Sequence, residues 1–145
     1  MNLSSIKSDS SVKHRKIEAE LKRIGEKLLS AINWNKKTEK RYFEIVFLGD
    51  QKMKALKKRF LKKTGKNHDV LAFPEPRNFP HPGERGQNLG EIYLNSRLLG
   101  DFNQLVFLTV HGLLHLLGFT HDRKRDTLKM ERIERQLIEK AGYQK

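Results

Sequence analysis

Apolar residues recur every three or four positions over three long stretches of the chain, a spacing typical of helices with one buried face. These stretches run from Val12 to about Asn33, from Asp50 to about Lys63 and from about Lys124 to Ala141. A fourth predicted helix, Phe102 to Leu117, is apolar on nearly every side. We therefore expect this fourth helix to be the buried helix at the centre of the fold.

The helical spacing also predicts which side chains are buried. In the helix that begins near Asp50, we expect Met53, Leu56 and Phe60 to face inward. The inward side of the last helix is predicted to hold four residues: Leu128, Ile133, Leu137 and Ile138. In the central helix, Asp101 is placed to cap the start and Gly118 to end it.

Three shorter stretches, rich in β-branched and aromatic residues, predict strands at Arg41–Leu48, Asp69–Phe73 and Gly90–Leu94. Between the last two, four prolines and two glycines indicate an irregular loop over residues 74–88. A loop of this length in a small domain is usually functional or mobile. The sequence thus predicts an α+β fold, in which a small mixed sheet of three to four strands packs with about four helices.

The length of 145 residues is typical of one domain, so we expect a single domain over 1–145, with residues 1–11 frayed or forming a short edge strand. No apolar run is long enough to span a membrane, and the first residues show no secretory signal. The chain has no cysteine, which excludes disulfides, thiolate zinc sites, iron–sulfur clusters and cysteine nucleophiles. We therefore expect a cytoplasmic protein.

Charge is distributed unevenly along the chain, which has 30 Lys and Arg against 17 Asp and Glu. Residues 1–68 hold nineteen basic and seven acidic residues, whereas residues 69–145 hold eleven and ten. Such an excess favours a polyanionic partner, a nucleic acid or an acidic membrane surface, although a merely soluble lysine-rich protein has the same composition. The densest basic stretch lies in the second predicted helix: Lys52, Lys54, Lys57, Lys58, Arg59, Lys62 and Lys63.

Three of the six histidines fall within eleven residues at the end of the central helix. His111 and His115 are four residues apart, which places both imidazoles on one helix face, and Gly118 lets the chain turn so that His121 approaches them. Three neutral nitrogen ligands leave tetrahedral zinc one position for water, as in catalytic sites. A structural zinc site would need a fourth protein ligand, for which Asp122 is the nearby candidate.

The histidine spacing also overlaps the metzincin protease pattern, in which a glutamate follows the first histidine as the general base. Gly112 stands at that position, so peptide hydrolysis would lack its proton acceptor. Phosphodiester cleavage depends less on such a general base, because a metal and cationic side chains stabilise the charge on the phosphoryl oxygens. The residues therefore favour a nuclease. An RNA- or ribosome-binding protein with a structural zinc and a zinc metalloprotease are the alternatives.

Three segments resemble the signature of the YbeY family, the endoribonucleases that mature ribosomal RNA. The first is HGLLHLLGFTHD, from His111 to Asp122. The second, DVLAFP from Asp69, resembles the family's T-D-V-L-S-F-P block with His68 in place of threonine, and the third, LGEI from Leu89, resembles L-G-D-I. Order and spacing match over roughly residues 40–140.

This resemblance implies a single-strand-specific, metal-dependent endoribonuclease that acts in ribosomal RNA maturation, including the 3′ end of 16S rRNA, and in ribosome quality control. It implies one Zn²⁺ per chain, or another divalent metal in the cell, with His111, His115 and His121 as ligands. The expected partners are single-stranded ribosomal RNA and ribosome or small-subunit proteins, with neither DNA nor a membrane among them.

The family also has an arginine, thought to contact substrate, seven residues before the aspartate of its T-D-V-L-S-F block. Seven residues before Asp69 stands Lys62, and Arg59 lies one helical turn earlier, so either can be this catalytic cation. Lysine keeps the charge but loses the bidentate geometry of arginine. We expect the other cations of this helix to bind RNA: Lys52, Lys54, Lys57, Lys58 and Lys63. The segment after Leu94 is shorter than is usual in the family, so one helix there is expected to be reduced or absent.

Overall fold

The computed structural model describes residues 12–32, 41–61, 69–76 and 87–143. Residues 1–11 and the candidate cations Lys62 and Lys63 lie outside these ranges. The helices within them are α1 (Val12–Ala31), α2 (Asp50–Leu61), α3 (Phe102–Leu116) and α4 (Lys124–Lys140). The strands are β1 (Arg41–Leu48), β2 (Val70–Pro74) and β3 (Gln87–Asn95). The α+β prediction is therefore confirmed.

The sheet is mixed, and its strand order is β1-β3-β2. The central strand β3 pairs in parallel with β1, where Ile45 stands opposite Ile92, and antiparallel with β2, where Ala72 stands opposite Ile92. The predicted loop over residues 74–88 was too long at both ends. Pro74 belongs to β2, and β3 already begins at Gln87, which pairs with Arg41 of β1.

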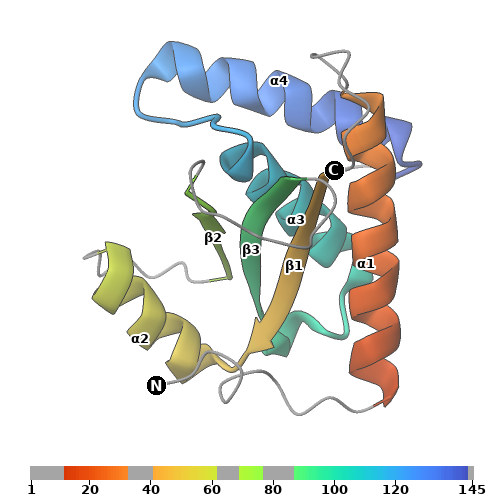
Figure 1. Ribbon diagram of the computed structural model, residues 1–145, viewed down its shortest axis with the longest axis vertical. Coiled ribbons are helices and arrows are strands. Elements are labelled where there is room, and N and C mark those ends of the chain that lie inside the picture. The colour runs from red at the N-terminus through yellow and green to blue at the C-terminus, as the bar shows by residue number, and fades with distance from the viewer. Residues whose placement is uncertain (1–11, 33–40, 62–68, 77–86, 144–145) are drawn as a thin grey trace.

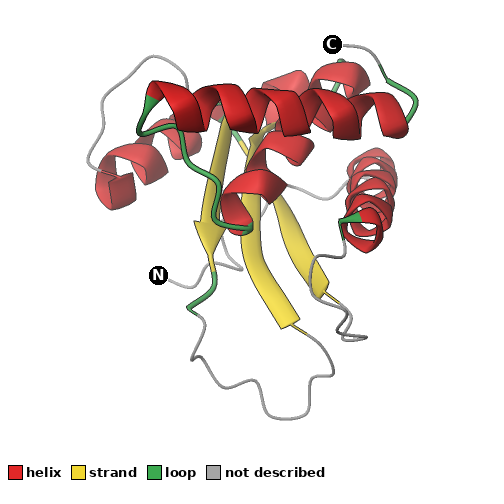
Figure 2. Cartoon of the chain, turned by 90° about the horizontal axis from the view of Figure 1, so that it is seen from above, coloured by secondary structure: helices red, strands yellow, loops and turns green. Residues whose placement is uncertain are grey.

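Apolar side chains form two clusters on the opposite faces of this sheet. Successive residues of a strand face opposite sides, so Ile92 and Leu94 join the larger cluster while Tyr93 joins the smaller one. The larger cluster packs against α1, α3 and α4, and the smaller one against Met53 and Leu56 of α2. Figure 1 shows α2 standing apart from the other three helices, and Figure 2 shows the strands between α2 and α1.

The central helix α3 begins at Phe102, as the sequence predicts, and ends at Leu116, one residue earlier than predicted. Asp101 caps its first turn by accepting a hydrogen bond from the backbone N–H of Gln104, at 3.2 Å. Gly118 follows its last turn with φ at +101°, a conformation that glycine adopts without steric cost. The intervening residues are largely buried against the larger cluster. None of the helices that the structure describes combines the length and apolar character needed to cross a lipid bilayer.

Two residues predicted to be buried are exposed. Phe60 is 55% exposed because it lies in the last turn of α2, beyond the contacts that bury Met53 and Leu56. Leu128 is 53% exposed, although Leu137 and Ile138 are buried as predicted and Ile133 packs against the larger cluster. The buried positions of α4 are Met130, Glu134, Leu137 and Ile138. Periodicity therefore predicted these two helices correctly but placed the edge of each buried face wrongly.

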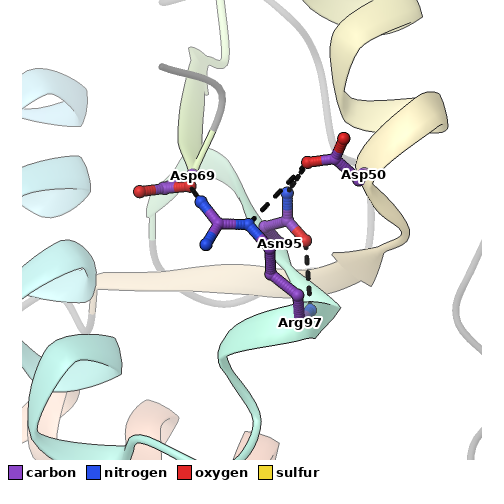
Figure 3. A network of polar contacts seen from close by, with 4 residues as sticks. All are labelled: Asp50, Asp69, Asn95 and Arg97. Atoms are coloured by element: carbon purple, nitrogen blue, oxygen red, sulfur yellow. Dashed lines mark hydrogen bonds and ion pairs between the residues drawn. The ribbon is translucent and has the colours of Figure 1, made fainter. Parts of the chain in front are cut away.

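A polar network joins the end of β3 to the beginnings of α2 and β2 (Figure 3). Asn95 is fully buried; its Nδ2 donates to Oδ1 of Asp50 at 3.0 Å, and its Oδ1 accepts from the backbone N–H of Arg97 at 3.0 Å. The Arg97 guanidinium lies between two carboxylates, pairing with Asp69 and approaching Asp50 at 3.8 Å. Arg97 belongs to a single 3₁₀ turn, η2 (Ser96–Leu98), which is the only helical element described between β3 and α3. The network therefore fixes α2 to the sheet.

We expect Leu114→Ala in α3 to lower the free energy of unfolding by about 2–5 kcal/mol, because it leaves a cavity in the larger cluster. Leu114 has no exposed surface. Leu128→Ala removes the same atoms from an exposed position and should change stability by less than about 0.5 kcal/mol. Urea unfolding with a chelator present measures both, since bound metal would add its own stabilisation. Equal losses in the two variants would contradict the buried position of α3.

Candidate metal centre

The turn after α3 brings three imidazoles together, as the sequence predicts. Nε2 of His115 lies 3.1 Å from Nε2 of His111 and 2.8 Å from Nε2 of His121. The candidate ligand atoms of all three side chains lie within 4.8 Å of one another. His111 and His115 are half-buried, while His121 is exposed. One side of the group is therefore accessible from solvent.

The remaining ring nitrogens determine where two of these histidines carry their protons. Nδ1 of His115 lies 3.0 Å from the carbonyl oxygen of Phe119, which can only accept, so Nδ1 is the donor. Nδ1 of His111 lies 3.2 Å from Oε2 of Glu134 and donates to this carboxylate in the same way. In the neutral rings, both Nε2 atoms then carry lone pairs that face each other. Lone pairs this close repel, so the arrangement fits a shared cation.

Glu134 is the functional residue that the sequence reasoning missed. Its residue surface is only 5% exposed, and it reaches His111 from α4, 23 positions along the chain. A carboxylate behind a metal-binding imidazole fixes the ring orientation and makes the other nitrogen a stronger ligand. The available signal was its helical spacing with Met130, Leu137 and Ile138, which places a glutamate on the buried face of α4.

Asp122, the candidate fourth ligand, is not part of the histidine group. It is exposed, and the residue that caps α4 is Arg123, which makes no side-chain cap hydrogen bond. Glu134 faces Nδ1 of His111 and not the convergent Nε2 atoms. Within the described part of the chain, the group thus consists of three histidines with no fourth protein ligand.

Packing against the sheet explains why glycine, and not a larger residue, stands at position 112. Gly112 is buried where α3 crosses β3, and a Cβ atom there would lie 3.0–3.2 Å from the side-chain atoms of Ile92. This position therefore faces the sheet. The structure leaves little space for the glutamate that the metzincin pattern places after the first histidine, which weakens the protease alternative further.

Electrostatics keep His115 neutral over a wide pH range. Its burial and the neighbouring His111 and His121, whose positive forms would repel a second charge, lower the pKa of His115 from 6.5 to about 4. The hydrogen bond to Phe119 opposes this shift only in part. Neutral imidazole is the form that binds a metal, so His115 is held ready as a ligand.

The cations of α2 lie on the other side of the sheet from α3. Arg59 is exposed, and its guanidinium carbon is 5.3 Å from the ring centroid of Phe60. The described lysines of α2 comprise three exposed residues and one half-buried one: Lys52, Lys54 and Lys58, then Lys57. Lys62 and Lys63 lie outside the described residues, so the choice between Lys62 and Arg59 stays a prediction.

Beside the histidines, the turn after α3 and the first turns of α4 line a shallow pocket of about 240 Å³. Its lining residues are Leu117, Gly118, Phe119, Thr120, Asp126 and Lys129. Lys129 lies 5.9 Å from the centroid of the Phe119 ring and supplies a positive charge here. The sequence reasoning did not single out this cation.

Comparison with known proteins agrees with this site. The profile of a family described as Endoribonuclease YbeY matches residues 2–142. The chain belongs to the YbeY family. The match includes all three segments that carry the resemblance, from Asp69 to Asp122, and thereby confirms it.

Individual YbeY relatives cover most of the chain. A protein named Endoribonuclease YbeY from Phytoplasma australiense is 28% identical over 116 residues, 74% of this chain and 79% of that protein. Those from Thermodesulfovibrio yellowstonii and a Chelativorans species are 32% and 33% identical over 65% and 66% of this chain. The matched part spans 63% of the length of each of these two relatives.

We expect Glu134→Gln to weaken metal binding by about 10–100-fold, because an uncharged amide orients His111 but no longer strengthens it as a ligand. Competition with a chromogenic chelator measures the affinity. The matched control is Glu131→Gln, which removes an exposed carboxylate from the same helix and should bind metal as the parent protein does. Equal affinities for the two variants would show that Glu134 does not support the site.

The pKa of His115 predicts how the metal-free protein responds to acid. Between pH 6.5 and about 4 the unfolded chain binds a proton at this position that the folded chain does not. The free energy of unfolding should therefore fall as the pH is lowered through this range. His115→Gln should flatten the dependence, as followed by urea unfolding in chelator at a series of pH values. An unchanged dependence would place the acid-sensitive group elsewhere.

Proposed function

We propose that this chain is a metal-dependent endoribonuclease that cleaves single-stranded RNA. One observation carries the proposal: two of the three convergent Nε2 atoms have their protons held on the opposite nitrogen, which prepares them for a cation. Membership of a family described as endoribonuclease supports the reaction class. The excess of Lys and Arg in the first half of the chain suits a polyanionic substrate.

His111, His115 and His121 are the proposed ligands of one divalent metal, which we assign as zinc because three imidazoles suit its tetrahedral site. A metal with one position left for water acts as a Lewis acid on the phosphoryl group and lowers the pKa of that water. Glu134 and the carbonyl of Phe119 hold the rings of His111 and His115 in place.

The proposed roles of the basic residues between Lys52 and Lys63 are RNA binding and charge stabilisation. Lys62 or Arg59 stabilises the negative charge that builds up on the phosphoryl oxygens. The remaining lysines bind the RNA backbone: Lys52, Lys54, Lys57, Lys58 and Lys63. Since α2 and α3 lie on opposite faces of the sheet, RNA bound along α2 must pass an edge of the sheet to reach the metal.

The wider role that we propose follows the family resemblance. The substrate is ribosomal RNA in the cytoplasm, including the 3′ end of 16S rRNA, and the protein takes part in ribosome quality control. Ribosome or small-subunit proteins are the proposed partners. The family description supports RNA as the substrate, and the profile match over residues 2–142 supports treating the chain as one functional domain.

Removing the metal should abolish RNA cleavage without abolishing RNA binding. We expect His115→Ala to lose most of its bound metal and its cleavage of a labelled single-stranded oligonucleotide, because one of three ligands is gone. The control is His81→Ala, which changes a histidine outside the motif and should keep both. Elemental analysis and single-turnover cleavage are the measurements, and a chelator should reproduce the loss in the parent protein.

A DNA oligonucleotide of the same sequence should not be cleaved. Metal-loaded parent protein that binds RNA tightly without any turnover would overturn the nuclease proposal and favour a binding protein with a structural zinc. Full metal content in His115→Ala would place the metal elsewhere.

A further inference from the structure

Phe60 is an exposed aromatic side chain on the basic helix α2. It is 55% exposed, and Leu128 is the other large apolar side chain that the described part of the chain leaves exposed to this degree. Met53 and Leu56, on the same helix, are buried against the sheet, so α2 has an apolar face that does not take in this ring. The ring keeps more than half of its surface in water beside cations, where a ligand can reach it.

Two further aromatic rings hold Phe60 in a fixed orientation. Phe60 packs edge-to-face on Phe73, with ring centroids 5.8 Å apart at 76°, and Phe73 packs on Tyr93 at 5.5 Å and 84°. Tyr93 is 2% exposed and its hydroxyl donates to Glu91 at 3.1 Å, which anchors the row in the sheet. Edge-to-face pairs of this kind are favourable geometries. The outermost ring is thus preorganised, which lowers the entropy lost when a ligand binds.

The charges around Phe60 match a single-stranded nucleic acid. Three lysines and one arginine of α2 are exposed: Lys52, Lys54, Lys58 and Arg59. The guanidinium of Arg59 is 5.3 Å from the ring centroid of Phe60. Proteins that bind single strands combine cations for the phosphates with aromatic rings on which unpaired bases stack. An anionic membrane can also accept cations and an exposed aromatic ring. Membership of a family described as endoribonuclease favours an unpaired nucleic acid as the ligand.

The edge strand β2 connects this ring with the three histidines. Phe73 packs with the cluster on the α2 side, and its neighbour Ala72 packs with the cluster on the α3 side. Helix α3 contacts β2 directly. Among the described strands, β2 pairs only with β3, so it forms an edge of the sheet. A strand of RNA that crosses this edge can reach the metal centre on one face and Phe60 on the other.

We propose that Phe60 is a stacking platform for one unpaired base of the RNA substrate. This inference rests on the proposed function and adds to it a residue that distinguishes single-stranded from double-stranded RNA. A base within a duplex is stacked between its neighbours and cannot lie on the ring. The platform therefore favours single-stranded RNA, and it adds affinity that does not depend on salt.

Binding of a single-stranded oligonucleotide by Phe60→Leu tests the proposal, because leucine keeps an apolar side chain against Phe73 but offers no flat ring. We expect about tenfold weaker binding, within the range measured for loss of one stacked base, and an unchanged slope of log affinity against log salt. Phe60→Trp should bind at least as well as the parent. Leu128→Ala, which removes exposed apolar surface from α4, should have no effect.

Removing basic residues, in contrast to removing the ring of Phe60, should change the salt dependence of binding. Replacing Lys58, Arg59 and Lys62 together with glutamine should flatten the salt slope by about 2, since each phosphate contact to a single strand contributes about 0.7. Metal content should stay at the parent level in every variant, because none of these residues belongs to the histidine group.

Oligonucleotides with one abasic nucleotide, moved along the sequence, identify the stacked base. At one position the missing base should weaken binding to the parent about tenfold and leave Phe60→Leu unaffected, because the two changes remove the same contact. In a Trp34→Phe background, the fluorescence of Phe60→Trp should be quenched by the intact oligonucleotide and not by the one that is abasic there. This fluorescence measurement does not require the leucine variant to be stable.

Unchanged affinity of Phe60→Leu, or equal sensitivity of parent and variant to every abasic position, would overturn the platform while leaving metal-dependent cleavage intact. A shift of Phe60→Leu to a smaller assembly at unchanged RNA affinity would overturn it too and would identify a contact between copies of the chain. Absence of RNA binding and cleavage in the metal-loaded parent would instead overturn the proposed function itself.

Discussion

Three imidazole nitrogens that face one another at 2.8 and 3.1 Å impose the constraint on which the site depends. The protons of His111 and His115 are committed to Glu134 and to the carbonyl of Phe119, so their lone pairs are directed at the same point. Without a cation the lone pairs of His111 and His115 repel each other. The packing of the surrounding helices must therefore offset this repulsion and hold the two rings in place.

On the face of the sheet that carries the histidines, buried side chains hold the site in position. Helix α3 crosses the sheet closely at Gly112, which fixes the height of the histidines above β3, and α4 packs over it so that Glu134 reaches His111. A carboxylate that is 5% exposed costs free energy unless it is hydrogen-bonded, so its position is tied to that of the imidazole. The opposite face of the sheet carries α2, held by Asn95 and Arg97, and Lys52, Lys54, Lys58 and Arg59 of this helix are exposed. The proposed metal chemistry and the proposed contacts to the RNA backbone thus lie on different faces of the sheet.

Sequence patterns predicted those features of the site that depend on residues close together in the chain. The spacing of His111 and His115 and the glycine at 118 were sufficient to bring three imidazoles together, because a helical turn and a reversal involve few residues. Glu134 was missed because its partner lies 23 positions away and no local signal names it. Phe60 was assigned to the core because periodicity gives the direction of a side chain, whereas burial requires a neighbouring element that extends far enough to cover it.

X-ray absorption spectroscopy of the metal-loaded protein tests the central claim most directly, since it reports the atoms bound to the ion. We expect three imidazole nitrogens at about 2.0–2.1 Å together with one oxygen donor that exchanges with solvent. His121→Ala should leave two imidazoles bound to the ion. A shell of four protein ligands, or one with fewer than three imidazoles in the parent protein, would contradict a catalytic three-histidine centre.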